Sequence, residues 1–126
     1  MMPSDGYGAA TDEVAEVIAR RGLGGAGPDD VRWIQTHISH VFLVGDRVYK
    51  LRKPVRLAFL DFSTLDQRNQ DCRLEVALNR RLAPDVYLGV VPMRIVDGIV
   101  EVGAVSDEPE DRSAEHAVLM RRLPDG

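Results

Sequence analysis

The chain has 126 residues, of which 44% are hydrophobic and 29% charged, a mixture typical of one compact domain and not of a disordered chain. Its net charge of −4, with basic residues scattered along the chain, provides no basic stripe of the kind that binds nucleic acid.

No apolar run approaches the roughly 20 residues that span a bilayer. The first residues have neither the basic leader nor the apolar core of a secretion signal. The single cysteine, Cys72, excludes an internal disulfide framework. We therefore expect a cytoplasmic protein with no nucleic-acid or membrane partner.

Residues 1–30 are expected to form a lead-in with one short helix. Apolar residues recur at helical spacing between Thr11, a candidate N-cap, and Gly22, a candidate helix stop. The glycine-rich segment 22–28 is typical of a flexible connector. A phosphate-binding loop is disfavoured there, because no strand precedes it and no Gly-Lys-Ser/Thr follows it.

From residue 31 onward the apolar period changes to two, which predicts strands. Two hairpins are predicted, one around Gly45 and Asp46 and one around Asp97 and Gly98. Pro92 marks a bulge or an edge in the first arm of the second hairpin. An acidic, solvated loop over residues 106–113 precedes the last strand.

A long helix is predicted between the two hairpins. Thr64 and Gln67 have the spacing of a capping box, and the helix is expected to run to about residues 81–82 because Pro84 blocks it. The connecting segment 54–65 is apolar but irregular, and we expect it to pack down on the sheet. The predicted fold is therefore α+β: an antiparallel sheet of about five strands with one long helix inserted after the third strand, preceded by a short helix.

Glu75 is unusual on this helix, because a helical wheel places it near the middle of a broad apolar arc. A carboxylate on a buried face must find a cation or give up its charge. Two alternatives remain open: Glu75 reaches water at the rim, or it pairs with Arg68 along the helix. The arc consists of Leu65, Cys72, Leu74, Val76, Leu78 and Leu82.

Lys50 presents the matching problem on the predicted strand 48–51. A strand lysine is most often an exposed guard of a sheet edge. A strand lysine and a later helix carboxylate can instead form an ion pair, which offsets the free-energy cost of burying each charge. The lysine can then also offer its ammonium to phosphate oxygens. This is the ion pair of active kinases.

Six sequence segments in this order resemble the opening region of aminoglycoside-phosphotransferase-like proteins, a kinase-like family. They are T-H-I-S (36–39), V-F-L-V-G-D-R-V-Y-K-L (41–51), K-P-V (53–55), F-L-D-F-S-T-L (59–65), L-N-R-R-L-A-P (78–84) and Y-L-G-V-V-P (87–92). The resemblance implies that residues 31–126 form a kinase-like amino-terminal lobe that binds ATP. In many such proteins a carboxy-terminal P-loop ATPase domain follows.

The resemblance implies a role for several residues. Lys50 would contact the nucleotide phosphates, with Glu75 as its helix partner. Thr36, His37 and Ser39 would lie in the turn over those phosphates, where hydroxyls or backbone N–H groups replace the missing glycine-rich pattern. The segment 120–123, with Met120 and Arg122, would begin the hinge that offers backbone hydrogen bonds to the base.

The catalytic motifs of the family's second lobe do not occur in the sequence. It contains no H-x-D-x-x-x-x-N run, no D-F-G-like run and no downstream P-loop. We therefore expect no catalytic residue in this chain and no metal site, since Mg²⁺ would be held by the missing carboxy-terminal lobe. His37 and His40 are not expected to bind metal, because no further Cys/His cluster accompanies them.

Three hypotheses about the function follow. The chain is a fragment of a phosphotransferase whose partner is the missing lobe or a P-loop ATPase domain. It is a stand-alone, non-catalytic binding or regulatory module that kept the lobe fold. Or it is an unrelated small sheet protein in which Lys50 and Glu75 are surface charges.

Overall fold

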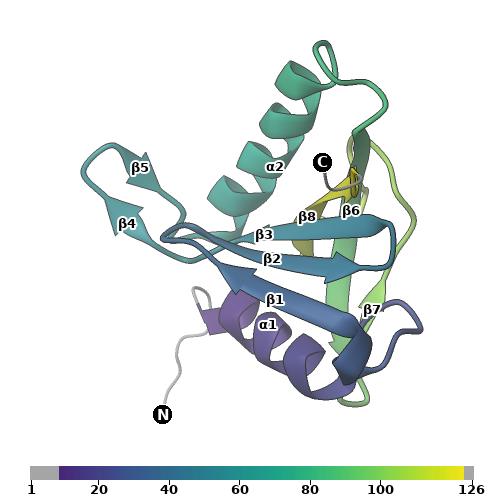
Figure 1. Ribbon diagram of the computed structural model, residues 1–126. Helices are drawn as coiled ribbons and strands as arrows, with labels where there is room; N and C mark the ends of the chain where they lie inside the picture. The colour runs from purple at the N-terminus through teal and green to yellow at the C-terminus, as the bar shows by residue number, and fades with distance from the viewer. Residues whose placement is uncertain (1–8, 124–126) are drawn as a thin grey trace.

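The computed structural model describes residues 9–123 and shows an α+β domain with a curled antiparallel sheet and two helices (Figure 1). The elements follow in the order α1 (Ala9–Arg21), a 3-10 turn (Pro28–Asp30), β1 (Val31–Gln35), β2 (Ser39–Val44), β3 (Arg47–Arg52), β4 (Arg56–Leu57), β5 (Leu60–Asp61), α2 (Leu65–Asn79), β6 (Tyr87–Val96), β7 (Ile99–Val102) and β8 (Glu115–Arg121). No helix among these residues is long and apolar enough to cross a membrane.

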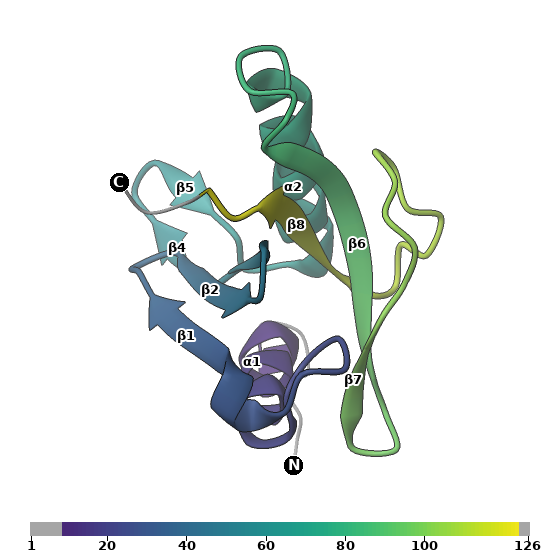
Figure 2. The ribbon, with the colours of Figure 1, turned by 45° about the vertical axis from the view of Figure 1, so that its right-hand side comes forward.

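Within residues 9–123 the main sheet has six strands, one more than predicted, in the order β1-β2-β3-β8-β6-β7, and every pair is antiparallel. β3 and β8 therefore lie at its centre. Figure 2 shows the sheet curling around α1, with β1 and β7 on either side of the helix. α2 packs against β8 and β6. The two helices thus belong to two separate core clusters, the larger beside α1 and the smaller beside α2.

The helix predicted near the N-terminus is present, but Thr11 is not its N-cap. α1 already begins at Ala9, and Thr11 is a fully buried residue inside it. Gly22 ends the helix as predicted, with φ of +89°. The glycine-rich segment is not an unstructured connector, because Leu23 and Ala26 exchange two backbone hydrogen bonds of 3.0 Å and Leu23 is buried. A side chain at Gly22 would collide with the Ala26 carbonyl, so this tight turn requires glycine.

Both predicted hairpins are present. Val44 pairs with Arg47 across Gly45 and Asp46, and Val96 pairs with Ile99 across Asp97 and Gly98. Asp97 and Gly98 have φ of 53° and 77°, the left-handed values that a tight hairpin turn needs.

Pro92 lies neither at an edge of the sheet nor at a bulge, so both predicted alternatives are wrong. β6 is an inner strand, and Pro92 pairs within it with His116 of β8. The ladder between β6 and β7 covers only Met93 to Val96, so the missing N–H of proline removes no hydrogen bond on that side. The register shift of β6 lies elsewhere, between Tyr87 and Gly89.

The capping box of α2 is confirmed, since the Thr64 hydroxyl accepts from the Gln67 amide and the Gln67 side chain accepts from the Thr64 amide. The helix ends at Asn79, earlier than predicted. Most of the segment before it does not pack down on the sheet, because β4 and β5 form a separate hairpin that projects from the body (Figure 1), although Phe62 near its end is buried. Phe59, between the two strands, is 86% exposed.

The predicted apolar arc of α2 is only partly correct, because Cys72 and Val76 are buried as predicted but its leucines are not. The buried side chains of the helix are Arg68, Asn69, Cys72 and Val76, whereas Leu74, Leu78 and, just beyond the helix, Leu82 are exposed. The sheet presents polar partners to α2, including the carbonyl of Ala114 and the amide of His116, which both bond to Asn69. Polar residues therefore occupy the inward face that the pattern assigned to leucines.

Candidate functional site

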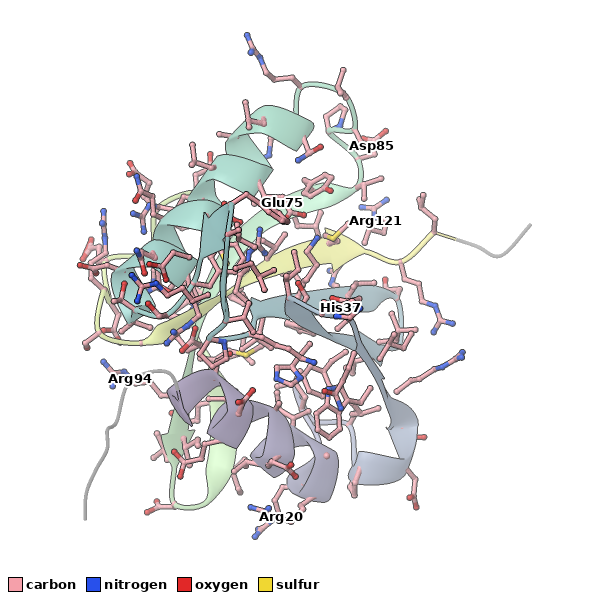
Figure 3. All side chains as sticks on the ribbon, turned by 90° about the vertical axis from the view of Figure 1, so that its left-hand side faces the viewer. Arg20, His37, Glu75, Asp85, Arg94 and Arg121 are labelled. Atoms are coloured by element: carbon pink, nitrogen blue, oxygen red, sulfur yellow. The ribbon has the colours of Figure 1, made fainter. Side chains whose placement is uncertain are left out.

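The predicted ion pair between Lys50 and Glu75 is present. Lys50 lies on β3, at the centre of the sheet, where it pairs with Val41 of β2 and Val118 of β8. Its Nζ is 2.9 Å from Oε2 of Glu75 on α2. Figure 3 shows Glu75 between α2 and the strands. The Lys50 side chain is 29% exposed and that of Glu75 only 12%, so neither residue is the surface charge that the alternatives allowed.

Arg52 is a second cation at Glu75, and sequence reasoning missed it. Its guanidinium donates from Nη2 to Oε1 of Glu75 in a short contact. It also donates from Nε and Nη2 to Oδ2 of Asp71, at 3.0 and 2.8 Å. Arg52 follows Lys50 by two positions, so the period of a strand places both on one sheet face. The spacing of two residues between Lys50 and Arg52 was therefore the sequence signal that could have revealed this second cation.

Glu75 is held ionised by these neighbours. Burial alone would raise the pKa of its carboxyl, but the charges and hydrogen bonds of Arg52 and Lys50 outweigh burial and lower the pKa below its usual value. The Tyr87 hydroxyl also donates to Oε2 of Glu75 at 3.3 Å. Burial, and then the Glu75 charge, raise the pKa of Tyr87, so this hydroxyl keeps its proton. Glu75 therefore binds two cations and one hydroxyl.

Arg68 does not pair with Glu75, which excludes the predicted alternative of a pair along the helix. It donates from Nε and Nη2 to the two carboxylate oxygens of Glu115 at 2.8 and 3.1 Å. The Arg68 side chain is fully buried and that of Glu115 is 2% exposed. This pair joins the first turns of α2 to the start of β8, and with Arg52 it fixes the helix to the sheet.

The turn over residues 36–39 connects β1 and β2. The Thr36 hydroxyl accepts from the amides of Ile38 and Ser39 at 3.3 and 3.0 Å, and Ser39 is 5% exposed. These amides are engaged within the turn, so a phosphate would have to displace the Thr36 hydroxyl from them. His37 is exposed.

His40 faces α1 and not the Lys50 side of the sheet. It is buried, receives a hydrogen bond from the Trp33 indole on Nδ1 and lies 2.8 Å from Asp12 through Nε2. Among the described residues, no three His, Cys, Asp or Glu side chains are grouped as metal ligands are.

The segment expected to form the hinge continues β8. Met120 pairs with Val48 and packs, half-buried, on the small core beside α2. The amides of Arg121 and Arg122 donate to the carbonyls of Val86 and Asp46 at 2.8 and 2.7 Å. Both amides are therefore already engaged, and a base would have to bond to carbonyl groups or to the Leu123 amide.

The cluster around Glu75 contains two cations and two carboxylates, Lys50 and Arg52 against Asp71 and Glu75. Arg52, with 5% of its side chain exposed, is enclosed, while Lys50 is open to solvent over 29%. An anion that approaches this face of the sheet would therefore meet the Lys50 ammonium first. The fold and this cluster define an α+β domain with a cationic group presented from its central strand.

The chain is similar to uncharacterized proteins of Mycobacterium bovis and of two strains of Mycobacterium tuberculosis. Each is 40% identical to it over 96 residues, which cover 76% of this chain and 16% of the relative. The chain thus matches only a small part of these relatives' length. No family model matches the chain, and no solved structure matches it.

Proposed function

We propose that this chain is the ATP-binding amino-terminal lobe of an aminoglycoside-phosphotransferase-like kinase. In this role it positions nucleotide phosphates for transfer to a hydroxyl acceptor. The observation that carries the proposal is the ion pair of 2.9 Å between Lys50 on the central strand β3 and Glu75 on the helix that crosses the same face. A strand lysine oriented by a helix carboxylate is the device with which kinases bind the α- and β-phosphates.

The order of the elements supports the proposal. Three antiparallel strands are followed by the small β4–β5 hairpin, by α2 and then by the strands that complete the sheet. Lys50 lies on the third of these strands and Glu75 on the helix, as in the amino-terminal lobe of kinase-like folds. The long relatives leave room for further domains beyond the matched segment.

Each proposed site residue then has a distinct task. The Lys50 ammonium contacts phosphate oxygens, and Glu75 orients that ammonium. The turn with Thr36, His37 and Ser39 covers the phosphates, and the backbone at Met120 and Arg122 lies beside the base. Mg²⁺ and the acceptor hydroxyl require groups of a second lobe, because the motifs that hold them do not occur in this sequence.

Isothermal titration of the chain with ATP and with inorganic tripolyphosphate tests the proposal. Lys50→Met is expected to weaken binding of both ligands by about tenfold or more, since a charge-assisted contact to phosphate is lost. Lys53→Met is the matched control, because Lys53 lies three positions further along and lines a different cavity, beside Trp33 and His40. Wild-type chain that binds neither ligand, or a Lys50→Met variant that binds both as tightly as wild type does, would refute the proposal.

A stand-alone binding or regulatory module is the second candidate. It is favoured by the large apolar side chains that the surface exposes, among them Phe59 at 86% and Leu82 at 86%. A chain that stays monomeric and soluble without a second lobe would support this candidate. Aggregation that is relieved by co-expression with the remaining part of a mycobacterial relative would favour the lobe of a larger enzyme.

A further inference from the structure

We propose that Asp71 and Arg52 form a positioning pair that holds Glu75, and through it the Lys50 ammonium, in the arrangement that binds nucleotide phosphates. The inference rests on the proposed function, in which the ion pair of Lys50 and Glu75 stays in place while Lys50 contacts phosphate oxygens. It adds two residues to which neither the sequence resemblance nor that ion pair assigns a role.

Glu75 is bound separately at each of its two carboxylate oxygens. Oε2 lies 2.9 Å from Nζ of Lys50, whereas Oε1 accepts from Nη2 of Arg52 in a short contact. Because the two cations bind different oxygens, Arg52 leaves Oε2 to Lys50 and fixes the other half of the carboxylate. The orientation of Glu75 toward the ammonium is therefore set from both ends.

Asp71 holds Arg52 in the position from which it reaches Glu75. Oδ2 of Asp71 accepts from Nε and Nη2 of Arg52 at 3.0 and 2.8 Å. The Arg52 side chain is 5% exposed, and its planar guanidinium suits contacts in a fixed geometry. Asp71 and Glu75 are four residues apart, about one turn of α2, so one guanidinium on β3 binds two successive turns of the helix.

This link to β3 is needed because α2 packs against other strands. The helix lies against β8 and β6, and Arg68 fixes its first turns to β8. Lys50 and Arg52 join the turn that carries Glu75 to β3 through ion pairs. The Lys50 side chain has a flexible stem and is 29% exposed, so it is the weaker of the two restraints. The enclosed Arg52 supplies the fixed contact.

The ion pair of Lys50 and Glu75 is consequently assembled before a ligand arrives, and it is kept when the ligand binds. A ligand that meets a fixed ammonium loses less affinity to the ordering of side chains than one that meets a mobile lysine. Asp71 and Arg52 thus raise the affinity for phosphate without contacting the phosphate themselves.

Removal of Asp71 distinguishes positioning from simple electrostatic attraction. Asp71→Ala removes a negative charge near the site, so attraction alone predicts tighter binding of inorganic tripolyphosphate. Loss of positioning predicts the opposite, and we expect isothermal titration of the full chain to show binding weakened by about threefold or more. The Asp71 side chain is 37% exposed, so alanine is expected to leave the fold intact.

Asp66→Ala is the matched control, since it removes an exposed carboxylate from the same helix outside the positioning pair. It is expected not to weaken binding. Affinity in Asp71→Ala that equals or exceeds that of the wild type overturns the proposal.

A double-mutant cycle tests whether Arg52 acts through Lys50. Arg52→Lys retains the charge but lacks the planar fork that binds Asp71 and Glu75 together. It is expected to weaken tripolyphosphate binding by about threefold or more in the wild-type chain. In Lys50→Met, where no ammonium remains to be positioned, it is expected to change the affinity by less than about twofold. Equal factors in the two backgrounds would mean that Arg52 acts independently of Lys50, which overturns the proposal.

A measurement without ligand distinguishes failure of this inference from failure of the proposed function. The sequence contains two lysines, Lys50 and Lys53, so acylation by an N-hydroxysuccinimide ester can be followed at each by mass spectrometry, with Lys53 as the internal reference. An ammonium held against a carboxylate reacts slowly. The rate at Lys50 relative to Lys53 is therefore expected to rise by about threefold or more in Asp71→Ala and in Arg52→Lys, but not in Asp66→Ala.

An unchanged ratio of the two acylation rates in both variants overturns the positioning pair, whether or not the chain binds a ligand. A wild-type chain that binds neither ATP nor tripolyphosphate overturns the proposed function instead.

Discussion

The buried pair of Arg68 and Glu115 should be a main source of stability for the attachment of α2 to the sheet. Arg68→Met removes the guanidinium and leaves the Glu115 carboxylate, 2% exposed, without its cation. It also removes the donor to the Phe62 carbonyl, which Arg68 Nη1 binds at 2.9 Å. Methionine fills a similar volume, so the perturbation is mainly electrostatic.

The expected loss in the free energy of unfolding follows from the burial of this ion pair. Removing one partner of a fully buried ion pair costs about 3–5 kcal/mol. A domain of this size has a free energy of unfolding of roughly 5–15 kcal/mol, so the variant should remain folded at 25 °C but with little margin. The melting temperature should fall by about 9–25 °C, at roughly 3–5 °C for each kcal/mol. Urea denaturation followed by circular dichroism measures the free energy directly.

The loss of stability in Arg68→Met should also depend on pH, because Glu115 titrates. Burial raises the pKa of Glu115 above the ordinary value of 4.5 even with Arg68 present. The folded state therefore binds the proton more tightly than the unfolded state, and the Glu115 contribution to stability falls as pH rises above about 4.5. Without Arg68 the pKa should rise further, so the loss in Arg68→Met should be greater at pH 7 than at pH 5.

A double variant separates loss of the pair from loss of packing. Arg68→Met/Glu115→Leu removes both charges and should recover most of the stability lost in Arg68→Met, because no unpaired charge remains buried. A loss below about 1 kcal/mol in Arg68→Met, or a double variant no more stable than the single one, would refute the reasoning.

Local signals predicted most of the fold. The hairpin turns at Gly45 and at Asp97 with Gly98, and the capping box at Thr64, depend on residues within a few positions of one another. The β4–β5 hairpin was missed because each strand has only two residues, too few for a period to show.

The inward face of α2 could not be predicted from its own sequence. A helical wheel assumes that the partner surface is apolar, so it selected Leu74 and Leu78, which are exposed. The true face is set by partners far along the chain, such as Glu115 for Arg68, 47 residues away. Glu75 was nevertheless placed near the buried face, because it lies beside Cys72 and Val76, which the arc included and which are buried.

The sequence allowed the Lys50–Glu75 ion pair to be predicted, but not the larger cluster that also contains Arg52 and Asp71. Lys50 and Glu75 were found because a charge among apolar residues requires a partner, and the sequence order suggested which one. Arg52 ends its strand beside Lys53 and Pro54, where a basic residue usually faces solvent. Only the structure shows that the Arg52 side chain is enclosed and reaches two carboxylates on α2.

Two further predictions concern α2 itself. Cys72 should resist alkylation, because burial raises the pKa of its thiol to about 12. Iodoacetamide at pH 8 should modify it only as fast as the domain opens, and complete labelling of the native chain within minutes would contradict the burial. Thr64→Ala should cost about 1 kcal/mol, because the Gln67 amide loses its acceptor at 3.2 Å, whereas Thr64→Ser should retain most of the stability. Equal urea midpoints for the two variants would show that the hydroxyl does not cap the helix.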